Sequence, residues 1–440
     1  MNQRPNATLK TGIAFLLCFP LFLTTLLRET MNDPYFQELF ADRIGGVNYG
    51  KSNEIYKFEK IKRAKRLALS EHPDRMILDF GIGENDSMAD ETVRNRMKVE
   101  VDCPENRGYA DNGIPEFQKA ASRFMKEQFQ VDIDSDNELN HAIGSKPALA
   151  MIPACFINPG DITLMTTPGY PVAGTHTRYF GGSVHQLQLR ADNGFLPDLK
   201  SIPDEICKRA KLLVLNYPNS PTGAIASHEF FADAVEFALQ NNIVIVHDAA
   251  HILLTYNHPS LSFLAIPGAK EVGIEIHSLS KGFNMIGWRI GWVCGNARIV
   301  QAFSDVKDNS DSGQFIAVQK SAIAALERPQ IFEDTRNKYQ RRLTKLISVL
   351  NSVGFDVQMP GGTYFLYTPI PRGTSDGLQF DSAEIAAEHL ITQQSIVTVP
   401  WDDAGPYLRF SVTYEADTPA EEDALMEETK TRLLNAKLTF

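Results

Sequence analysis

The sequence predicts an α/β protein: a large domain built on a mainly parallel sheet, followed by a smaller α+β domain. From about Asp161, short and continuously apolar segments alternate with helical segments, which is typical of parallel strands covered by helices on both faces. After Pro329 the pattern changes to a long, charged amphipathic helix followed by further strands. A length of 440 residues is enough for two or three domains.

The expected elements follow from these patterns in chain order. In the large domain we expect strands over 162–165, 184–189, 212–215, 243–247, 274–277 and 290–294, and helices over 115–129, 146–157, 229–240 and 314–326. In the small domain a helix over 330–353 precedes strands around 355–358, 364–367 and 407–412. We place an N-terminal arm and part of the small domain at 31–80, the large domain at 81–327 and the rest of the small domain at 328–440.

The charge balance narrows the choice of partners. Asp and Glu number 54 against 43 Lys and Arg, a net charge of -11, whereas nucleic acid or an anionic membrane would require a basic face. The five cysteines are scattered without paired spacing: Cys18, Cys103, Cys155, Cys207 and Cys294. We therefore expect no zinc site, no disulfide framework and a reducing, cytoplasmic compartment.

Residues 1–30 differ from the rest of the chain. Their apolar run at 12–27 is interrupted and short for a membrane span, and it resembles a signal-peptide core without a small-residue cleavage site. Met31 opens ordinary globular sequence, so translation starts there instead of at Met1, or residues 1–30 form a removable extension. Whether residues 1–30 form a targeting or anchoring segment stays open.

The most informative motif centres on Lys281. An apolar strand over 272–277 runs into Ser278, Ser280 and Lys281, and Arg289 follows eight residues after the lysine. A primary amine at a strand end, flanked by hydroxyls and a cation, suits an imine with an aldehyde cofactor whose phosphate lies alongside. Pyridoxal phosphate has this chemistry. The alternative is a surface lysine after a strand, which the motif alone would favour.

Two further segments end expected strands. Asp248 closes an apolar strand and would be costly to bury without a cation such as a protonated pyridine nitrogen. It could equally cap the next helix. Asn219 and Ser220 lie in a rigid Pro- and Gly-containing loop and could donate to a phenolate oxygen, although a plain turn has the same composition.

Two charged positions suggest anion binding. Ser145 and Lys146 open a helix after a glycine, which presents free backbone N–H groups to a phosphate. Many helices begin this way without binding anything. Arg409 lies on an apolar strand, where its planar fork suits a carboxylate or an internal salt bridge.

In chain order these motifs resemble the class I/II aminotransferases of pyridoxal-phosphate fold type I, and the resemblance covers about residues 40–435. It implies a seven-stranded sheet, a Lys281 imine whose freed amine then moves a proton, Asp248 at the pyridine nitrogen and Arg409 at the substrate carboxylate. The cofactor-binding residues that it implies are Tyr109, Ser145, Lys146, Tyr170, Asn219, Ser220, Asp248, His251, Ser278, Ser280, Lys281 and Arg289.

The resemblance also implies a homodimer, because Tyr109 matches a tyrosine that reaches the neighbouring subunit's phosphate. Two positions depart from the family pattern. The usual Asn-Pro-Thr-Gly loop here has Ser220 before the proline, so either Asn219 or Ser220 contacts the cofactor's O3′. His251 stands where the family often has a tyrosine.

The segments 48–61 and 79–84 most resemble the LL-diaminopimelate aminotransferase group, with Tyr56 and Gly83 at substrate positions. That group transfers an amino group from LL-2,6-diaminopimelate to 2-oxoglutarate on the lysine route. Asp111 or Asn112 would read the distal ammonium in a loop shorter than usual. Alternatives are an aspartate, alanine or aromatic aminotransferase, a lyase or decarboxylase, or a silent regulator, although the retained Lys281, Asp248 and Arg409 argue against silence.

Overall fold

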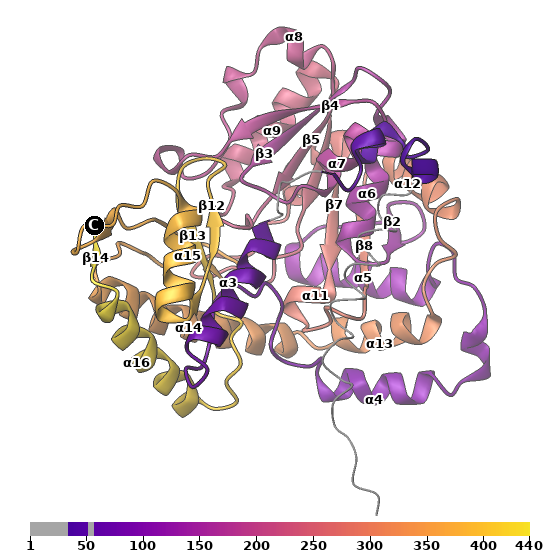
Figure 1. Ribbon diagram of the computed structural model, residues 1–440. Coiled ribbons are helices and arrows are strands. Elements are labelled where there is room, and N and C mark those ends of the chain that lie inside the picture. Colours follow the sequence, from indigo (N-terminus) through magenta and orange to yellow (C-terminus); the bar gives the residue numbers. More distant parts are fainter. Residues whose placement is uncertain (1–33, 52–56) are drawn as a thin grey trace, which may run out of the picture. The chain divides into compact units, whose positions relative to one another are not determined.

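The computed structural model describes residues 34–51 and 57–440, which belong to two units, Met1–Tyr56 and Lys57–Phe440 (Figure 1). The first unit contains the short helix α2 (Pro34–Gln37) and two 3-10 turns. Its Gln37 side-chain amide donates to the carbonyls of Val47 at 2.9 Å and Tyr49 at 3.0 Å. The expected extension over 1–30 lies outside the described residues. Within the described ranges, no helix has the length and apolar character needed to cross a membrane.

The second unit contains a sheet of seven strands within its described residues, in the order β2-β8-β7-β6-β5-β3-β4 (Figure 1). The strands are β2 (Leu139–Ala142), β3 (Ile162–Thr167), β4 (Ser183–Gln188), β5 (Ala210–Asn216), β6 (Val244–Asp248), β7 (Gly273–Ser278) and β8 (Gly291–Gly295). Only β8 among them runs against its neighbours. The predicted mainly parallel seven-stranded sheet is therefore confirmed.

Strand β2 was not expected from the sequence, because it has no apolar run. Asn140 and His141 at its centre are buried and held by side chains instead. The Asn140 amide donates to Ser304 Oγ at 2.9 Å, and His141 Nε2 lies 2.9 Å from Gln314 Oε1. Burial lowers the pKa of His141 to about 4, so the ring is neutral in the sheet.

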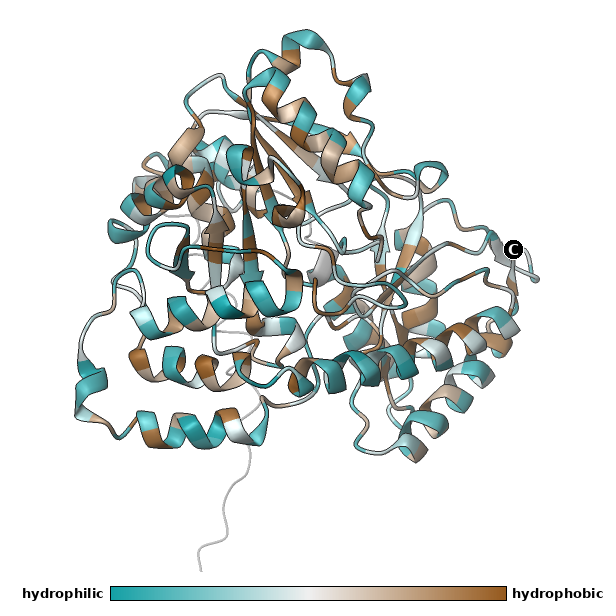
Figure 2. Ribbon diagram, turned by 180° about the vertical axis from the view of Figure 1, so that it is seen from behind, coloured by the Kyte–Doolittle hydropathy of each residue, from teal (hydrophilic) through white to brown (hydrophobic). Residues whose placement is uncertain are grey.

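Helices cover both faces of the sheet, and the buried side chains form two apolar clusters, one on each face. The helices of this domain are α4 (Glu91–Glu100), α5 (Pro115–Phe129), α6 (Ser145–Phe156), α7 (Val172–Tyr179), α8 (Asp204–Cys207), α9 (His228–Asn241), α10 (Ala269–Val272), α11 (Leu279–Gly282), α12 (Ala297–Asp308) and α13 (Ile316–Leu326). Successive residues of β6 show the alternation: Ile245 packs with α5, α9 and α13, and Val246 packs with α6 and α12. Figure 2 shows hydrophobic strands between helices of mixed hydropathy.

The smaller domain packs helices against short strands. Its elements are α3 (Lys57–Glu71), β1 (Leu78–Asp79), α14 (Gln330–Ser352), β9 (Phe365–Pro369), β10 (Gly373–Thr374), α15 (Ala383–Gln394), β11 (Ile396–Val397), β12 (Val399–Trp401), β13 (Tyr407–Ser411), α16 (Pro419–Asn435) and β14 (Leu438–Thr439). Strand β13 pairs antiparallel with β9 and β12, and the sequence-distant β1 pairs parallel with β11. This domain is therefore closed by segments from both ends of the chain.

The expected strand at 355–358 was wrong. Phe355 and Val357 are buried in alternation, as the sequence pattern indicated, but no neighbouring strand pairs with them among the described residues. The Asn351 side chain takes that place: its amide donates to the Val357 carbonyl at 3.0 Å and its oxygen accepts from the Val357 N–H at 2.9 Å.

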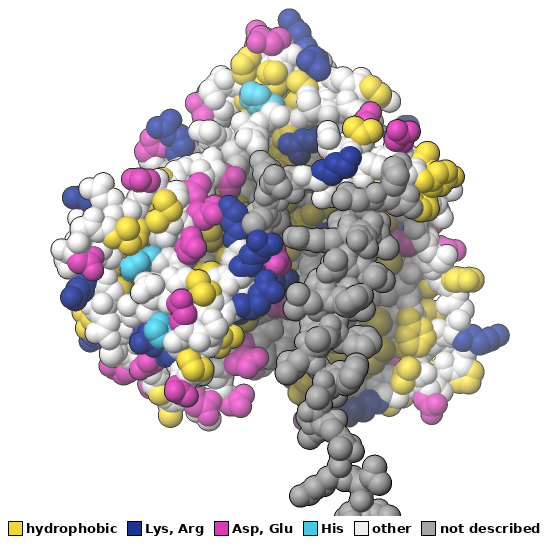
Figure 3. Space-filling model, viewed as in Figure 1, with side chains coloured by type: hydrophobic (Ala, Val, Ile, Leu, Met, Phe, Trp, Pro, Cys, Tyr) yellow, Lys and Arg dark blue, Asp and Glu magenta, His cyan; other side chains and the backbone are white. Residues whose placement is uncertain are grey.

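Figure 3 shows Lys and Arg side chains gathered over α3 with acidic side chains beside them. These basic residues are paired: Lys60 lies 2.5 Å from Glu384, and Arg66 lies 3.1 Å from Glu59. The patch is therefore a mixed, ion-paired surface, of the kind that contributes little to stability.

Candidate active site

Three neighbouring parallel strands end in polar residues at one edge of the large sheet. β5 ends at Asn216, β6 at Asp248 and β7 at Ser278. Asn216 lies opposite Asp248 in the register, and the Asn216 amide donates to the Asp248 carbonyl at 2.9 Å. The carboxyl edge of such a sheet is where α/β proteins bind ligands, so these residues lie at a candidate ligand-binding site.

Lys281 lies in α11, the single helical turn that follows β7. Ser278 Oγ begins the turn by accepting from the Ser280 N–H at 3.1 Å. The Lys281 amine donates to the carbonyl of Gly83 at 3.1 Å and lies 5.4 Å from the centre of the Tyr364 ring. The lysine at the end of the strand therefore lies in a helical turn, and its amine reaches a backbone segment distant in the sequence.

Asp248 is buried, and this burial raises the pKa of its carboxyl to about 6. One carboxylate oxygen accepts from the Ala250 N–H at 3.1 Å. Residues 250–253 form a turn and no helix follows Asp248 directly, so the alternative role as a helix cap does not apply. A cation placed at this carboxylate would restore its ordinary ionisation.

Behind Asp248, on the opposite face of the sheet, lies a buried carboxylate that the sequence reading missed. Glu275 accepts from His247 Nδ1 at 2.8 Å, His277 Nε2 at 2.6 Å, Ser262 Oγ at 2.7 Å and the Phe263 N–H at 2.7 Å. Burial alone would raise the pKa of Glu275, but the two histidines hold it far below its usual range. A glutamate and histidines inside apolar strands are the signal that could have revealed this support.

The start of α6 faces a guanidinium. Gly144 has a positive φ of 79°, which favours glycine, and a Cβ there would lie 2.4 Å from Arg289 Nη2 and displace the guanidinium. Arg289 also donates to Ser280 Oγ at 3.3 Å. Ser145 and Lys146 are the first residues of α6, whose N-cap makes no side-chain hydrogen bond. Free backbone N–H groups beside a cation form an anion-binding site.

The loop after β5 and the turn after β6 contain buried polar atoms that form no hydrogen bond with the described residues. Asn219 is fully buried and its oxygen accepts from Thr222 Oγ1 at 2.7 Å. The Ser220 N–H donates to Asn216 Oδ1 at 2.9 Å. Asn219 Nδ2 and His251 Nδ1 have no hydrogen-bond partner among the described residues. Burial lowers the pKa of His251 well below its usual value, so the ring is neutral.

Arg409, on β13, is a buried cation that forms no ion pair with any acidic residue of the described chain. Its Nη2 donates to the Gly81 carbonyl at 3.0 Å, and its guanidinium carbon lies 4.2 Å from the centre of the Phe365 ring. Nε has no partner among the described residues. Burial lowers the pKa of Arg409 to about 10, which leaves it charged at neutral pH. The expected internal salt bridge is absent from the described residues, and a ligand carboxylate would satisfy this charge.

The other expected site residues lie outside this buried group. Tyr109 is 85% exposed, and Tyr170, after β3, is 40% exposed. Asp111 is exposed, with its backbone carbonyl bonded to Lys307. The Asn112 amide donates to Asp308 Oδ1 at 2.6 Å and so tethers α12. Tyr56 lies outside the described residues.

Comparison with known proteins identifies the family of this chain. The family model for aminotransferase class I and II matches residues 75–423. The LL-diaminopimelate aminotransferases of Methanocaldococcus jannaschii and Methanococcus maripaludis are 52% and 50% identical, each over 93% of this chain and 100% of their own length. The substrate-bound structure of BacF from Bacillus subtilis matches with a TM-score of 0.80 and 29% identity, covering 89% of this chain and 97% of its own. The chain therefore belongs to the class I and II aminotransferase family.

Proposed function

We propose that this protein binds pyridoxal 5′-phosphate at the carboxyl edge of the large sheet and transfers an amino group from LL-2,6-diaminopimelate to 2-oxoglutarate, giving tetrahydrodipicolinate and glutamate. One observation carries the chemistry. The Lys281 amine donates to the Gly83 carbonyl, and the buried Arg409 guanidinium, which forms no ion pair among the described residues, donates to the Gly81 carbonyl of the same segment. An amine that bonds a cofactor must lie near the group that binds the substrate carboxylate.

The residues at the edge fit pyridoxal phosphate. Arg289, the start of α6, Ser278 and Ser280 would hold the phosphate, and Asp248 would pair with the pyridine nitrogen. Asn219 Nδ2, which has no partner among the described residues, favours Asn219 over Ser220 as the donor to O3′. The further contacts would be Lys146 and Ser145 at the phosphate, His251 near O3′ and Tyr170 on the ring face. When bound, the cofactor supplies an electron sink for a carbanion at the substrate's Cα.

The chain's own residues would then perform two tasks. Arg409 orients the substrate by its α-carboxylate, since a buried fork donates two parallel hydrogen bonds to such a group. The Lys281 amine would move the proton at the substrate's Cα, because it contacts the Gly83 carbonyl, two residues from the Gly81 carbonyl that Arg409 contacts. Arg409 is buried, which strengthens its interaction with a bound carboxylate.

The donor is proposed from the relatives. Two proteins about half identical to this chain are named LL-diaminopimelate aminotransferase. The contact between the Gly83 carbonyl and the Lys281 amine supports the substrate role proposed for Gly83. The Asn112 amide is already bonded to Asp308, which leaves Asp111 as the better candidate to meet the distal ammonium.

Asp111→Asn tests that assignment. We expect the change to lower kcat/KM for LL-diaminopimelate by about one order of magnitude, because a charge-assisted contact contributes roughly 1.5–3 kcal/mol. Glutamate, which has no distal amine, should be turned over as before. Asp102→Asn, another exposed acid of the same domain, is the control. Equal losses for both donors would assign Asp111 a structural role.

The proposal includes a homodimer in which Tyr109 completes the partner's phosphate site, as its 85% exposure permits. Mixing Lys281→Ala with Tyr109→Phe subunits tests it. In a heterodimer one site collects both lesions and the other collects neither, so activity should rise above that of either mutant homodimer. If subunits exchange, as shown by labelled chains, and activity stays flat, then Tyr109 acts within its own chain.

The reaction type is tested by stoichiometry. A transaminase forms one glutamate for each 2-oxoglutarate consumed and releases no ammonia, whereas a lyase releases ammonia and needs no oxo acid. Incubation of the pyridoxal-phosphate-loaded protein with LL-diaminopimelate and 2-oxoglutarate should give glutamate without ammonia. Ammonia release without an oxo acid would support the lyase alternative.

A further inference from the structure

The segment 81–87 crosses the site and sets the positions of its two cationic side chains. The Gly81 carbonyl accepts from Arg409, and the Gly83 carbonyl accepts from Lys281. Tyr364 OH also donates to Gly83 at 2.7 Å. Because these carbonyls are two residues apart on one backbone, the register of the segment fixes the spacing between the amine and the guanidinium.

The middle of the segment is attached to the large domain. The Asn85 amide donates to the backbone carbonyl of Lys281 at 2.7 Å and to Asn284 Oδ1 at 2.6 Å. This contact reaches the turn that carries the lysine itself. The segment therefore touches Lys281 twice, once at its amine and once at its backbone.

The far end is anchored to α14 through Asp86, whose side chain is 6% exposed. Its carboxylate accepts from Lys338 Nζ at 2.5 Å, Arg342 Nη1 at 3.1 Å and Tyr339 OH at 3.1 Å. Lys338 also donates to Ser87 Oγ at 2.7 Å. Asp86 is thus an acid on which three side chains from about one turn of α14 converge.

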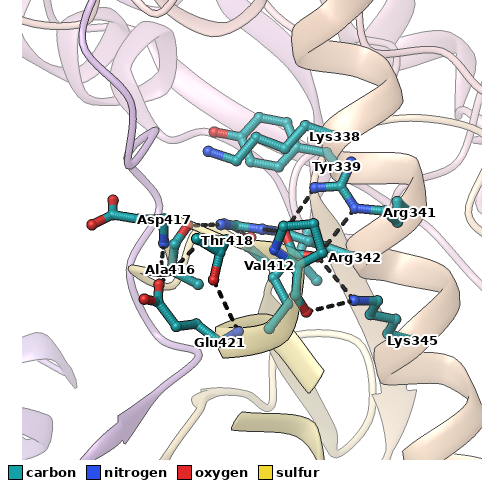
Figure 4. Close-up of polar contacts among 12 residues, drawn as sticks. Lys338, Tyr339, Arg341, Arg342, Lys345, Val412, Ala416, Asp417, Thr418 and Glu421 are labelled. Atoms are coloured by element: carbon teal, nitrogen blue, oxygen red, sulfur yellow. Dashed lines mark hydrogen bonds and ion pairs between the residues drawn. The ribbon is translucent and has the colours of Figure 1, made fainter. Parts of the chain in front are cut away.

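The same helix holds the chain that follows β13, the strand of Arg409. Arg342 is fully buried and donates to the carbonyls of Val412 at 3.1 Å, Tyr414 at 2.7 Å and Ala416 at 2.9 Å. Figure 4 shows this side chain reaching from α14 to Val412 and Ala416, beside Lys338 and Tyr339. One helix therefore locks both the segment 81–87 and the end of the strand that carries Arg409.

We propose that Lys338, Tyr339 and Arg342 are positioning residues for substrate binding: through Asp86 they hold the segment 81–87 in the register that places Lys281 and Arg409 at the correct separation for one amino acid. None of the three needs to touch the substrate. The inference rests on the proposed function, because it assigns the substrate carboxylate to Arg409. A misplacement of about 1 Å at such a distance from the chemistry can cost on the order of 10²-fold.

Lys338→Met removes one anchor while Arg342 and Tyr339 still satisfy Asp86, so the fold should persist. We expect KM for the amino donor and for 2-oxoglutarate to rise about tenfold each, with kcat and the dissociation constant of pyridoxal phosphate changed less than about threefold. Lys338→Arg should restore KM, since a guanidinium can also bind Asp86.

Arg341→Met is the matched control. Arg341 lies on the same helix and donates to Glu422 at 2.8 Å in the same ionic network, but among the described residues it forms no hydrogen bond or ion pair with Asp86. It should leave both KM values unchanged. Equal effects of the two Met variants, or a loss of cofactor affinity as large as the loss of substrate affinity, would overturn the inference.

The dissociation constant of 2-oxoglutarate, measured by calorimetry on the pyridoxal-phosphate-loaded protein, tests the positioning role without turnover. A tenfold weakening in Lys338→Met but not in Arg341→Met supports it, and no difference overturns it. Failure of the unmutated protein to form glutamate from any amino donor would instead contradict the proposed function. The two failures are therefore separate.

Discussion

Replacing Lys281 with alanine will lower kcat by about four orders of magnitude or more while the protein stays folded. The change removes the amine that would bond the cofactor and the group that would move the proton at Cα. The Gly83 carbonyl does not need the hydrogen bond from this amine, because it also accepts from Tyr364 OH. Single-turnover and steady-state assays with added pyridoxal phosphate measure the loss.

Lys270→Ala serves as the control. Lys270 precedes the other end of β7, where it pairs with Glu138 at 2.6 Å, so the same strand loses a lysine away from the site. This variant should keep full activity and a similar melting temperature. Transamination by Lys281→Ala at a rate near that of the unmutated protein would refute the assignment of the active site.

Arg409→Lys will lower kcat/KM about 100-fold for the amino donor and for 2-oxoglutarate alike, mainly through KM, since charged hydrogen bonds contribute about 1.5–3 kcal/mol. Each half-reaction presents an α-carboxylate to the same fork, and lysine offers a point charge in place of two parallel donors. The loss of the Nη2 contact to Gly81 adds to this effect.

The exposed Arg372→Lys is the control for the same substitution in the same domain and should behave like the unmutated protein. Cofactor affinity should be unchanged in Arg409→Lys, because Arg409 lies at the substrate carboxylate. An effect confined to one substrate would indicate that Arg409 binds a distal carboxylate instead of the α-carboxylate.

The features predicted correctly from the sequence are those that depend on neighbouring residues in the chain. Apolar runs of four to six residues gave the parallel strands, and each strand end carried its own polar signal, as at Asp248 and Lys281. The strand at 355–358 failed because burial alternation alone does not show whether a partner strand lies beside it. Strand β2 was missed because its buried Asn140 and His141 are satisfied by distant side chains.

The rest of the candidate site depends on contacts between distant parts of the chain. Asp86 meets α14 more than 250 residues later, and Gly81 meets Arg409 328 residues later. No local sequence pattern predicts which distant residues will contact each other in this way. The Glu275 network was also missed, although a charged residue inside an apolar strand signals a buried partner. Tyr109, in contrast, was singled out only by resemblance, and its role across an interface stays a prediction.

The donor preference tests the central claim most directly. Initial rates of glutamate formation should be measured with 2-oxoglutarate and LL-diaminopimelate, aspartate, alanine or phenylalanine under identical conditions, with Lys281→Ala as the blank. The account predicts the highest kcat/KM for LL-diaminopimelate, by about one to two orders of magnitude over the others. Faster turnover of aspartate, alanine or phenylalanine would contradict the proposed donor.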